Sequence, residues 1–212
     1  MITIAIAKGR MQDDALALLA RAGIRVSAED VNSRRLAVDD ETGNYRFLFV
    51  KPADVPVYVE HGIADCGMVG RDVLLESEAD LLLPLDLGIA RCRMVVAAVD
   101  PEVMTRAVGM LRVATKYSQI AAAHFGARGM PVEIIRLSGS VELAPALGLA
   151  DLIVDLVETG RTLRDNGLTV VDEIAESTGR LVVNRASYQL KAEAVSGLVN
   201  ALRSVLDGGE RA

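Results

Sequence analysis

The sequence ELAPALGLADLIVDLVETGRTL fills residues 142–163 and contains an apolar, strand-like run that ends in the acidic residue Asp155. A turn at residues 158–162, with hydroxyl side chains and a glycine, follows this run, and a short helical pattern comes next. A strand that delivers such a turn to the start of a helix is typical of an anion-binding site, because backbone N–H groups and the helix dipole face the ligand. The stretch therefore predicts an α/β fold with a phosphate site.

Each residue of this turn has a separate expected role. Gly160 lets the backbone approach a phosphate closely, and Thr159 and Thr162 can donate hydroxyl hydrogen bonds. Arg161 either adds positive charge or points to solvent. Asp155 can accept hydrogen bonds from sugar hydroxyls, or it can serve as a turn or N-cap residue. By itself the turn indicates a phosphate site with a nearby acid.

Strand-like and helical patterns alternate along the rest of the chain. This alternation is typical of α/β proteins with mostly parallel sheets. Strands are expected near 2–7, 47–50, 64–69, 94–99, 112–115, 132–137, 152–154, 168–174 and 181–184, and helices near 12–22, 55–60, 118–127 and 187–206.

A short internal sequence repeat, the Gly-x-Ala-Asp echo, gives information on domain organisation. The residues Gly62-Ile63-Ala64-Asp65 recur as Gly148-Leu149-Ala150-Asp151, and an apolar run follows each copy. The repeat is either a coincidence among common residues or a sign of two lobes of related design. For two lobes, we expect a first lobe of residues 1–89 plus 179–212 and a second lobe of residues 90–178.

Composition excludes several classes of protein. The net charge of −6 argues against a nucleic-acid surface, which would need a basic face. The apolar runs are too short for a membrane span, and the N-terminus resembles a first strand rather than a signal peptide, so we expect a cytoplasmic protein. The two cysteines, Cys66 and Cys92, have no paired metal-ligand spacing and are expected to be buried.

The region of residues 142–163 is similar to the signature of the ATP phosphoribosyltransferases, the first enzymes of histidine biosynthesis. The matching positions are Glu142, Gly148, Ala150, Ile153, Asp155, Leu156, Thr159, Gly160, Thr162 and Leu163. Further similar blocks lie at residues 7–10, 54–62, 65–72, 113–117 and 137–142, so the resemblance covers nearly the whole chain.

This resemblance implies a fold of two α/β lobes like the type II periplasmic binding proteins, with the active site in the inter-lobe cleft. The family has a long form with a C-terminal regulatory domain and a short form without it, and this chain resembles the short form. Such subunits work in a hetero-oligomer with a regulatory partner similar to histidyl-tRNA synthetase. The substrates implied are ATP and phosphoribosyl pyrophosphate.

In the implied reaction, N1 of the adenine ring displaces pyrophosphate from C1 of phosphoribosyl pyrophosphate. The nucleophile is already a lone pair, so no Ser, Cys or His needs activation, and His61 and His124 lie in no triad-like context. By resemblance, the Glu158–Thr162 turn holds the 5′-phosphate, and Asp155, with Glu142 behind it, faces the ribose. Mg²⁺ is expected with the substrate phosphates, without direct protein ligands.

Basic residues are expected to bind the polyphosphate groups. Lys8 and Arg10 follow the first strand, where α/β proteins place ligand contacts. Arg34 and Lys51 are the next candidates, although Arg35 is adjacent to Arg34 and solvation is the usual fate of such side chains. The family more often has Arg at position 51, and a lysine binds phosphate as a point charge rather than a bidentate fork.

Small residues complete the expected site. Ser138 and Gly139 can line the cleft, unless they only begin a helix with Ser140 as its N-cap. Asp65, Gly67 and Gly70 are expected at the cleft edge of the first lobe, with strand–helix packing as the competing interpretation.

Other functions fit two α/β lobes. Solute-binding proteins and regulator effector domains share the architecture, but neither needs the phosphate turn. A plain nucleotide-binding protein would need a Walker-type or dinucleotide-binding glycine loop, which the sequence lacks.

Overall fold

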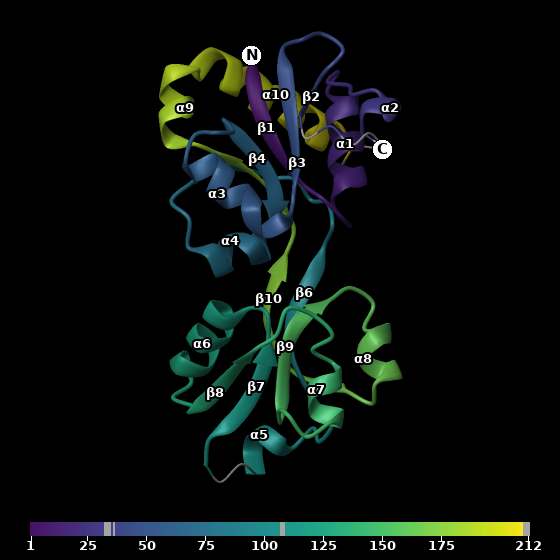
Figure 1. Cartoon of the computed structure of the whole chain (residues 1–212), viewed down its shortest axis with the longest axis vertical. Coiled ribbons are helices and arrows are strands. Elements are labelled where there is room, and N and C mark those ends of the chain that lie inside the picture. Colours follow the sequence, from purple (N-terminus) through teal and green to yellow (C-terminus); the bar gives the residue numbers. More distant parts are fainter. Residues whose placement is uncertain (32–34, 36, 107–108, 210–212) are drawn as a thin grey trace. The chain divides into compact units, whose positions relative to one another are not determined.

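The computed structural model describes residues 1–31, 35, 37–106 and 109–209 and divides the chain into two compact units. Unit 1 comprises Met1–Ala90 and Thr178–Ala212, and unit 2 comprises Arg91–Ser177. Each unit contains a sheet covered by helices (Figure 1). The chain thus passes into unit 2 after Ala90 and returns to unit 1 after Ser177.

The unit 1 sheet has the strand order β2-β3-β1-β4-β11-β5. Its central strand β1 runs parallel to β3 and β4, while β2, β5 and β11 pair antiparallel with their neighbours. The apolar runs of the central strands are buried on both faces, as parallel strands require. The strands are β1 (Ile2–Ala7), β2 (Ala37–Asp39), β3 (Tyr45–Val50), β4 (Cys66–Gly70), β5 (Leu82–Asp86) and β11 (Gly179–Val183).

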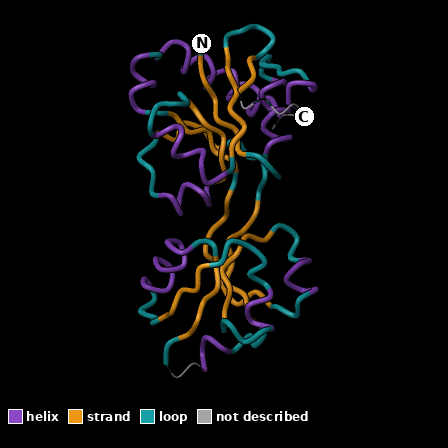
Figure 2. Tube along the Cα trace, in the orientation of Figure 1, coloured by secondary structure: helices purple, strands orange, loops and turns teal. Residues whose placement is uncertain are grey.

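Helices cover this sheet and bury its apolar residues (Figure 2). The C-terminal helix contributes Val195, Leu198 and Leu202, which are fully buried at helical spacing. The unit 1 helices are α1 (Gln12–Arg21), α2 (Ala28–Val31), α3 (Val55–Glu60), α4 (Arg71–Ser77), α9 (Arg185–Leu190) and α10 (Ala192–Gly209), with a 3-10 turn η1 (Pro52–Asp54).

The prediction of a single helix at 187–206 was wrong, because two helices, α9 and α10, occupy this segment. Asn184 caps α9 through a hydrogen bond that its side chain accepts from the Ser187 N–H. Lys191 then leaves helical geometry, with φ −120°, and its ammonium binds the Asp65 carboxylate at 2.8 Å. The break between α9 and α10 thus places a cation on a buried acid.

The unit 2 sheet has the order β10-β6-β9-β7-β8. Strands β7, β8 and β9 are parallel, whereas β6 pairs antiparallel with both β9 and β10. The expectation of mostly parallel sheets was therefore too broad, since only β3, β1 and β4 in unit 1 and β9, β7 and β8 in unit 2 pair in parallel. The strands are β6 (Cys92–Ala98), β7 (Leu111–Thr115), β8 (Val132–Arg136), β9 (Leu152–Val157) and β10 (Thr169–Ser177).

Two hydrophobic clusters lie on opposite faces of this sheet. One contains Ile120 and Phe125 of α6 (Ser118–Ala127) together with Val113 and Val154. The other contains Ala144 of α7 (Leu143–Ala146) and Leu163 of α8 (Arg161–Asp165) together with Ala114 and Ile153. We call these the α6 face and the α8 face. A short helix, α5 (Val103–Arg106), precedes β7.

The Gly-x-Ala-Asp echo is a structural repeat rather than a coincidence. Asp65 donates its N–H to the Thr3 carbonyl at 2.8 Å and accepts the Thr3 N–H on its carboxylate at 2.9 Å. Asp151 makes the same two bonds with Arg112, at 2.9 and 2.8 Å. Each aspartate therefore fixes the start of one parallel strand against its neighbour, and both units share this device.

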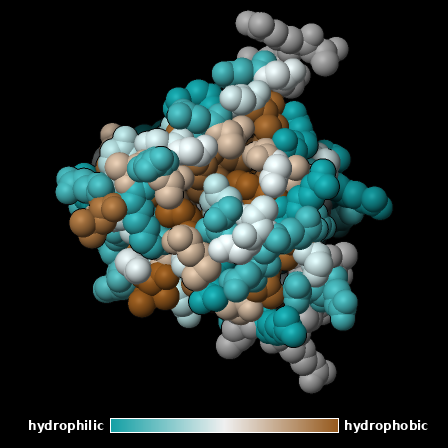
Figure 3. All heavy atoms as spheres, turned by 90° about the horizontal axis from the view of Figure 1, so that it is seen from above, coloured by the Kyte–Doolittle hydropathy of each residue, from teal (hydrophilic) through white to brown (hydrophobic). Residues whose placement is uncertain are grey.

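Hydrophilic and hydrophobic side chains both reach the surface. The face in view in Figure 3 shows hydrophilic side chains with smaller groups of hydrophobic ones between them. Both cysteines are buried as expected, and burial raises the pKa of the Cys66 thiol to about 12.

The Asp151–Arg112 contact predicts a pH-dependent contribution to stability. Hydrogen bonds from Arg112 lower the pKa of Asp151 below its ordinary value. Its stabilising effect is therefore present above the unfolded-state pKa of about 3.9 and is lost as the pH falls through the lower folded-state value. We expect Asp151→Ala to lower the free energy of unfolding by about 1–3 kcal/mol at pH 7, as measured by urea unfolding.

The matched control is Asp165→Ala, which removes an exposed carboxylate paired with Arg161 on the same helix turn. That variant should change the free energy of unfolding by no more than about 0.5 kcal/mol. A loss for Asp151→Ala that stays constant from pH 7 to about pH 3 would contradict the assigned role of the ionised carboxylate.

Candidate active site

The turn after β9 is shaped by one glycine and one arginine. Gly160 has φ +71° and serves as N-cap of α8, so this position needs a residue that tolerates left-handed backbone. The Arg164 guanidinium donates from Nη1 to the Thr159 carbonyl at 3.1 Å and so braces the turn. The Arg161 N–H also points to Thr159 Oγ1, at 3.4 Å. The predicted turn is thus a preformed structure.

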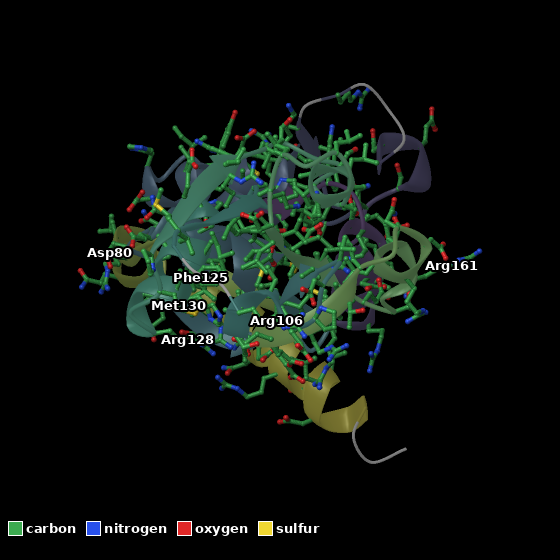
Figure 4. The ribbon with its side chains drawn as sticks, turned by 90° about the horizontal axis from the view of Figure 1, so that it is seen from below. Asp80, Arg106, Phe125, Arg128, Met130 and Arg161 are labelled. Atoms are coloured by element: carbon green, nitrogen blue, oxygen red, sulfur yellow. The ribbon has the colours of Figure 1, made fainter. Side chains whose placement is uncertain are left out.

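Arg161 follows the second of its two expected alternatives. Its side chain is 83% exposed and pairs with Asp165 at 3.5 Å. Figure 4 shows it at the rim of the molecule, directed outward. In the described geometry, Arg161 therefore supplies no charge to the turn.

Asp155 and Glu142 lie toward the same face of the unit 2 sheet as this turn. Asp155 lies two residues from both Ile153 and Val157 along β9, so its side chain shares the α8 face with theirs. It is half-buried. Its Oδ1 accepts the Leu156 N–H at 2.8 Å. Glu142 is the N-cap of α7, which packs against β9 on that face. The backbone therefore brings both carboxylates to the side that holds the turn.

Ser138 and Gly139 follow β8 and are exposed. The next residue, Ser140, has φ +49°, which is uncommon for a non-glycine residue and indicates local strain. The predicted alternative of Ser140 as N-cap was wrong, because Glu142 occupies that position of α7. The loop instead lies beside the end of β7, since β7 and β8 are parallel neighbours.

Two of the predicted cations adjoin one another at the carboxyl edge of the unit 1 sheet. The Lys8 N–H donates to the Val50 carbonyl at 2.8 Å, so Lys8 lies beside Lys51 where β1 and β3 end. Arg10 follows in the turn before α1, and its Nη2 donates to the Ala90 carbonyl at 3.3 Å. Arg34 lies outside the described residues.

Asp65 lies at the opposite end of this sheet, at the start of β4. Its carboxylate accepts hydrogen bonds from the Thr3 N–H, Ser187 Oγ and Lys191 Nζ at 2.7–2.9 Å. Burial alone would raise the pKa of Asp65, but these bonds, led by the one from Lys191, lower it overall. The geometry assigns Asp65 to the structure of unit 1 rather than to a substrate.

The two glycines of β4 differ in what surrounds them. A Cβ on Gly67 would lie 2.7 Å from Val55 Cγ1 and 2.9 Å from Val59 Cγ2, so this glycine lets α3 pack on the sheet. The packing interpretation therefore applies to Gly67. Gly70 ends β4, at the same edge as Lys8, and a Cβ there would lie 2.3 Å from Asp72 Oδ1. Of the three residues expected at the cleft edge, only Gly70 lies at a carboxyl end.

The histidines lie outside this arrangement. His124 on α6 has a buried side chain, with Nε2 3.0 Å from Asp172 Oδ2 and Nδ1 3.0 Å from Arg128 Nη1. Since Arg128 can only donate, Nδ1 accepts and Nε2–H donates to Asp172. Burial, with a contribution from Arg128, lowers the pKa of His124 and favours this neutral form.

The described residues contain no cluster of three or more His, Cys, Asp or Glu side chains suited to holding a metal. Among the described helices, none combines the length and apolarity that a membrane crossing requires.

Two residues near the turn were not among the sequence-based candidates. Arg164 braces the turn, and Lys116 lies directly after β7, beside β9. The block of residues 113–117 resembled the family, and this was the available signal for Lys116. The helical pattern after Thr162 gave no sign that Arg164 folds back onto Thr159.

Comparisons with known proteins show which family the chain is similar to. A family model described as ATP phosphoribosyltransferase matches residues 51–204. A protein of that name from Caldanaerobacter subterraneus is 49% identical over 99% of both chains. Another from Geobacillus kaustophilus is 50% identical over 97% of this chain and 99% of its own.

Solved structures include a chain of the same family. A chain of the "ATP phosphoribosyl transferase (HisG:HisZ) complex" from Thermotoga maritima is 37% identical, with a TM-score of 0.84, over 98% of this chain and 100% of its own. A Bordetella pertussis BvgS VFT2 domain and Tv2483 bound to L-arginine, both 15% identical, have TM-scores of 0.61 and 0.60 and show the shared fold. The expected fold of two α/β lobes is thereby confirmed, and the chain belongs to the ATP phosphoribosyltransferase family.

Proposed function

We propose that the Glu158–Thr162 turn binds the 5′-phosphate of phosphoribosyl pyrophosphate, and that Asp155 binds the ribose hydroxyls. The chain is an ATP phosphoribosyltransferase and catalyses the first step of histidine biosynthesis. The observation that carries the assignment is the preformed turn, in which Gly160 has φ +71° and Arg164 holds the Thr159 carbonyl. A turn held open in this way exposes backbone N–H groups to an anion at little reorganisation cost.

The reaction needs positioning and charge stabilisation more than acid–base chemistry. N1 of adenine carries a lone pair and attacks C1 of the ribose without prior deprotonation. Positive charge develops on the ribose ring as pyrophosphate departs, and a nearby carboxylate stabilises it. Asp155 supplies that carboxylate, and Glu142 on the same side of the sheet adds a second negative charge.

The departing pyrophosphate needs positive charge. Lys8, Arg10 and Lys51 supply it from the carboxyl edge of unit 1, where the register places Lys8 beside Lys51. Mg²⁺ prefers oxygen ligands and keeps several waters, so the substrate phosphates would hold it, and it would supply part of the charge neutralisation there. Because Lys51 is a point charge rather than a bidentate fork, it holds a phosphate oxygen with less directional specificity than an arginine would.

The chain works in the cytoplasm with a HisZ-like regulatory subunit, in a hetero-oligomer. The HisZ-like subunit is supported by the Thermotoga maritima structure, which is described as a HisG:HisZ complex and whose matched chain is covered completely by this one.

The overall reaction is tested by an absorbance assay that follows formation of an N1-substituted adenine from ATP, phosphoribosyl pyrophosphate and Mg²⁺. We expect turnover with the HisZ-like partner present and its loss when either substrate is omitted. No turnover with both substrates, Mg²⁺ and the partner would contradict the proposal.

The role of the turn is tested by a pair of glycine variants. Gly160 and Gly129 have similar φ values, +71° and +65°, and Gly129 lies in the loop after α6. We expect Gly160→Ala and Gly129→Ala each to cost about 1–2 kcal/mol of stability from left-handed strain. Only Gly160→Ala should raise the KM for phosphoribosyl pyrophosphate, by about tenfold, a loss of about 1.4 kcal/mol in binding.

Steady-state kinetics on both variants distinguish strain from function. Equal KM values for the Gly160 and Gly129 variants would show that the turn does not bind the phosphate.

A further inference from the structure

Most basic side chains of unit 2 are neutralised by carboxylates within the unit. The ion pairs are Arg91–Glu176, Arg93–Glu173, Arg106–Glu102, Arg112–Asp151, Arg128–Asp172 and Arg161–Asp165.

Three other cations, Lys116, Arg136 and Arg164, have no carboxylate within ion-pair distance in the part of the chain that the structure describes. All three lie at the same edge of the sheet. Lys116 follows β7, Arg136 ends β8, and Arg164 lies in α8 after β9. Since β7, β8 and β9 are parallel, their carboxyl ends share one edge, which is where α/β sheets bind ligands. These three cations therefore lie at the edge that holds the β9–α8 turn, together with the carboxylates of Asp155 and Glu142.

The strand register separates the roles of these three cations. Arg136 is level with Thr115, so it shares the α6 face. Lys116 follows Thr115 just after β7 ends, and its ammonium lies over the ring of Tyr117, a residue of the α6 face. The pairing of Thr115 with Val154 brings this end of β7 beside the part of β9 that continues into Asp155. Arg164 is already engaged in holding the Thr159 carbonyl.

The side chain of Lys116 is held ready at this edge. It is exposed, and its Nζ lies 4.7 Å from the centre of the Tyr117 ring. Tyr117 is buried and donates its N–H to Thr115 Oγ1, which in turn donates to the Val154 carbonyl at 2.7 Å. The ring is thus a fixed support. A cation–π contact at an exposed site is weak, so a phosphate oxygen can displace it.

We propose that Lys116 is a further substrate-binding residue, whose ammonium binds a polyphosphate oxygen of a substrate. The inference rests on the proposed function, since it assumes that the β9–α8 turn and Asp155 hold the phosphoribosyl group. The anion is either the pyrophosphate of phosphoribosyl pyrophosphate or the triphosphate of ATP. A lysine suits this task because its ammonium is a compact charge on a flexible stem that can follow a leaving group.

The test uses Lys116→Met, which keeps the length of the side chain and removes its charge, and Lys116→Arg, which keeps the charge. We expect Lys116→Met to raise the KM for one substrate about tenfold, a change of about 1.4 kcal/mol, and Lys116→Arg to restore most of it. Measuring each KM at saturation of the other substrate identifies whether phosphoribosyl pyrophosphate or ATP carries the anion. The thermal unfolding midpoint should stay unchanged in both variants.

The matched control is Arg106→Met on α5, which removes one positive charge at the opposite end of the sheet, before β7. It should leave both KM values as in the parent. If Lys116→Met has the same KM values as the parent, or if Lys116→Arg raises the KM as much as Lys116→Met does, the inference is overturned. Turnover by the parent would still uphold the proposed function. If the parent shows no turnover, calorimetric titration with Mg²⁺ and each substrate separately decides, since unchanged affinities in Lys116→Met would then overturn the inference.

Discussion

In each unit, one aspartate forms two hydrogen bonds with the backbone of the neighbouring strand. These bonds fix the register on which the rest of the unit depends. Asp151 holds both the N–H and the carbonyl of Arg112, and its carboxylate also meets the Arg112 side chain. A slip of one residue would turn Asp155 from the α8 face to the α6 face, because strand side chains alternate. The face of the sheet that Asp155 takes is therefore set at the far end of the same strand.

The same constraint operates in unit 1. Asp65 ties β4 to β1 through Thr3, and its remaining lone pairs bind Ser187 and Lys191 at the junction of α9 and α10. This places the C-terminal helices on the sheet, whereas Lys8 and Lys51 lie at the opposite, carboxyl edge. Each unit thus uses the amino ends of its parallel strands for stability, and the residues that we propose for binding lie at the carboxyl ends.

The sequence predicted much of this arrangement because the patterns involved are local. The apolar strands, the turn at residues 158–162 and the helix of residues 118–127 follow from periodicity and turn residues. The fold of two lobes came from the family resemblance and from the Gly-x-Ala-Asp echo. What failed were features that depend on contacts distant in sequence. Asp65 resembled a site residue until its bonds to Ser187 and Lys191, more than 120 positions away, were visible.

Two further features required the three-dimensional structure. Gly67 could have been a ligand-contact glycine, and only the positions of Val55 and Val59 show that it serves helix packing. Apart from the family-like block of residues 113–117, nothing in the sequence distinguishes Lys116 from the other basic residues, and the role proposed for it depends on which carboxylates pair with those residues. Which cations are neutralised is decided by the fold.

The central claim is that the β9–α8 turn is the 5′-phosphate site, and a structure with phosphoribosyl pyrophosphate and Mg²⁺ bound tests it most directly. We expect the 5′-phosphate to accept hydrogen bonds from the backbone and hydroxyl groups of Thr159–Thr162, with the ribose hydroxyls at Asp155. A 5′-phosphate bound beside Lys8 and Lys51, with the turn after β9 free of ligand, would contradict the account.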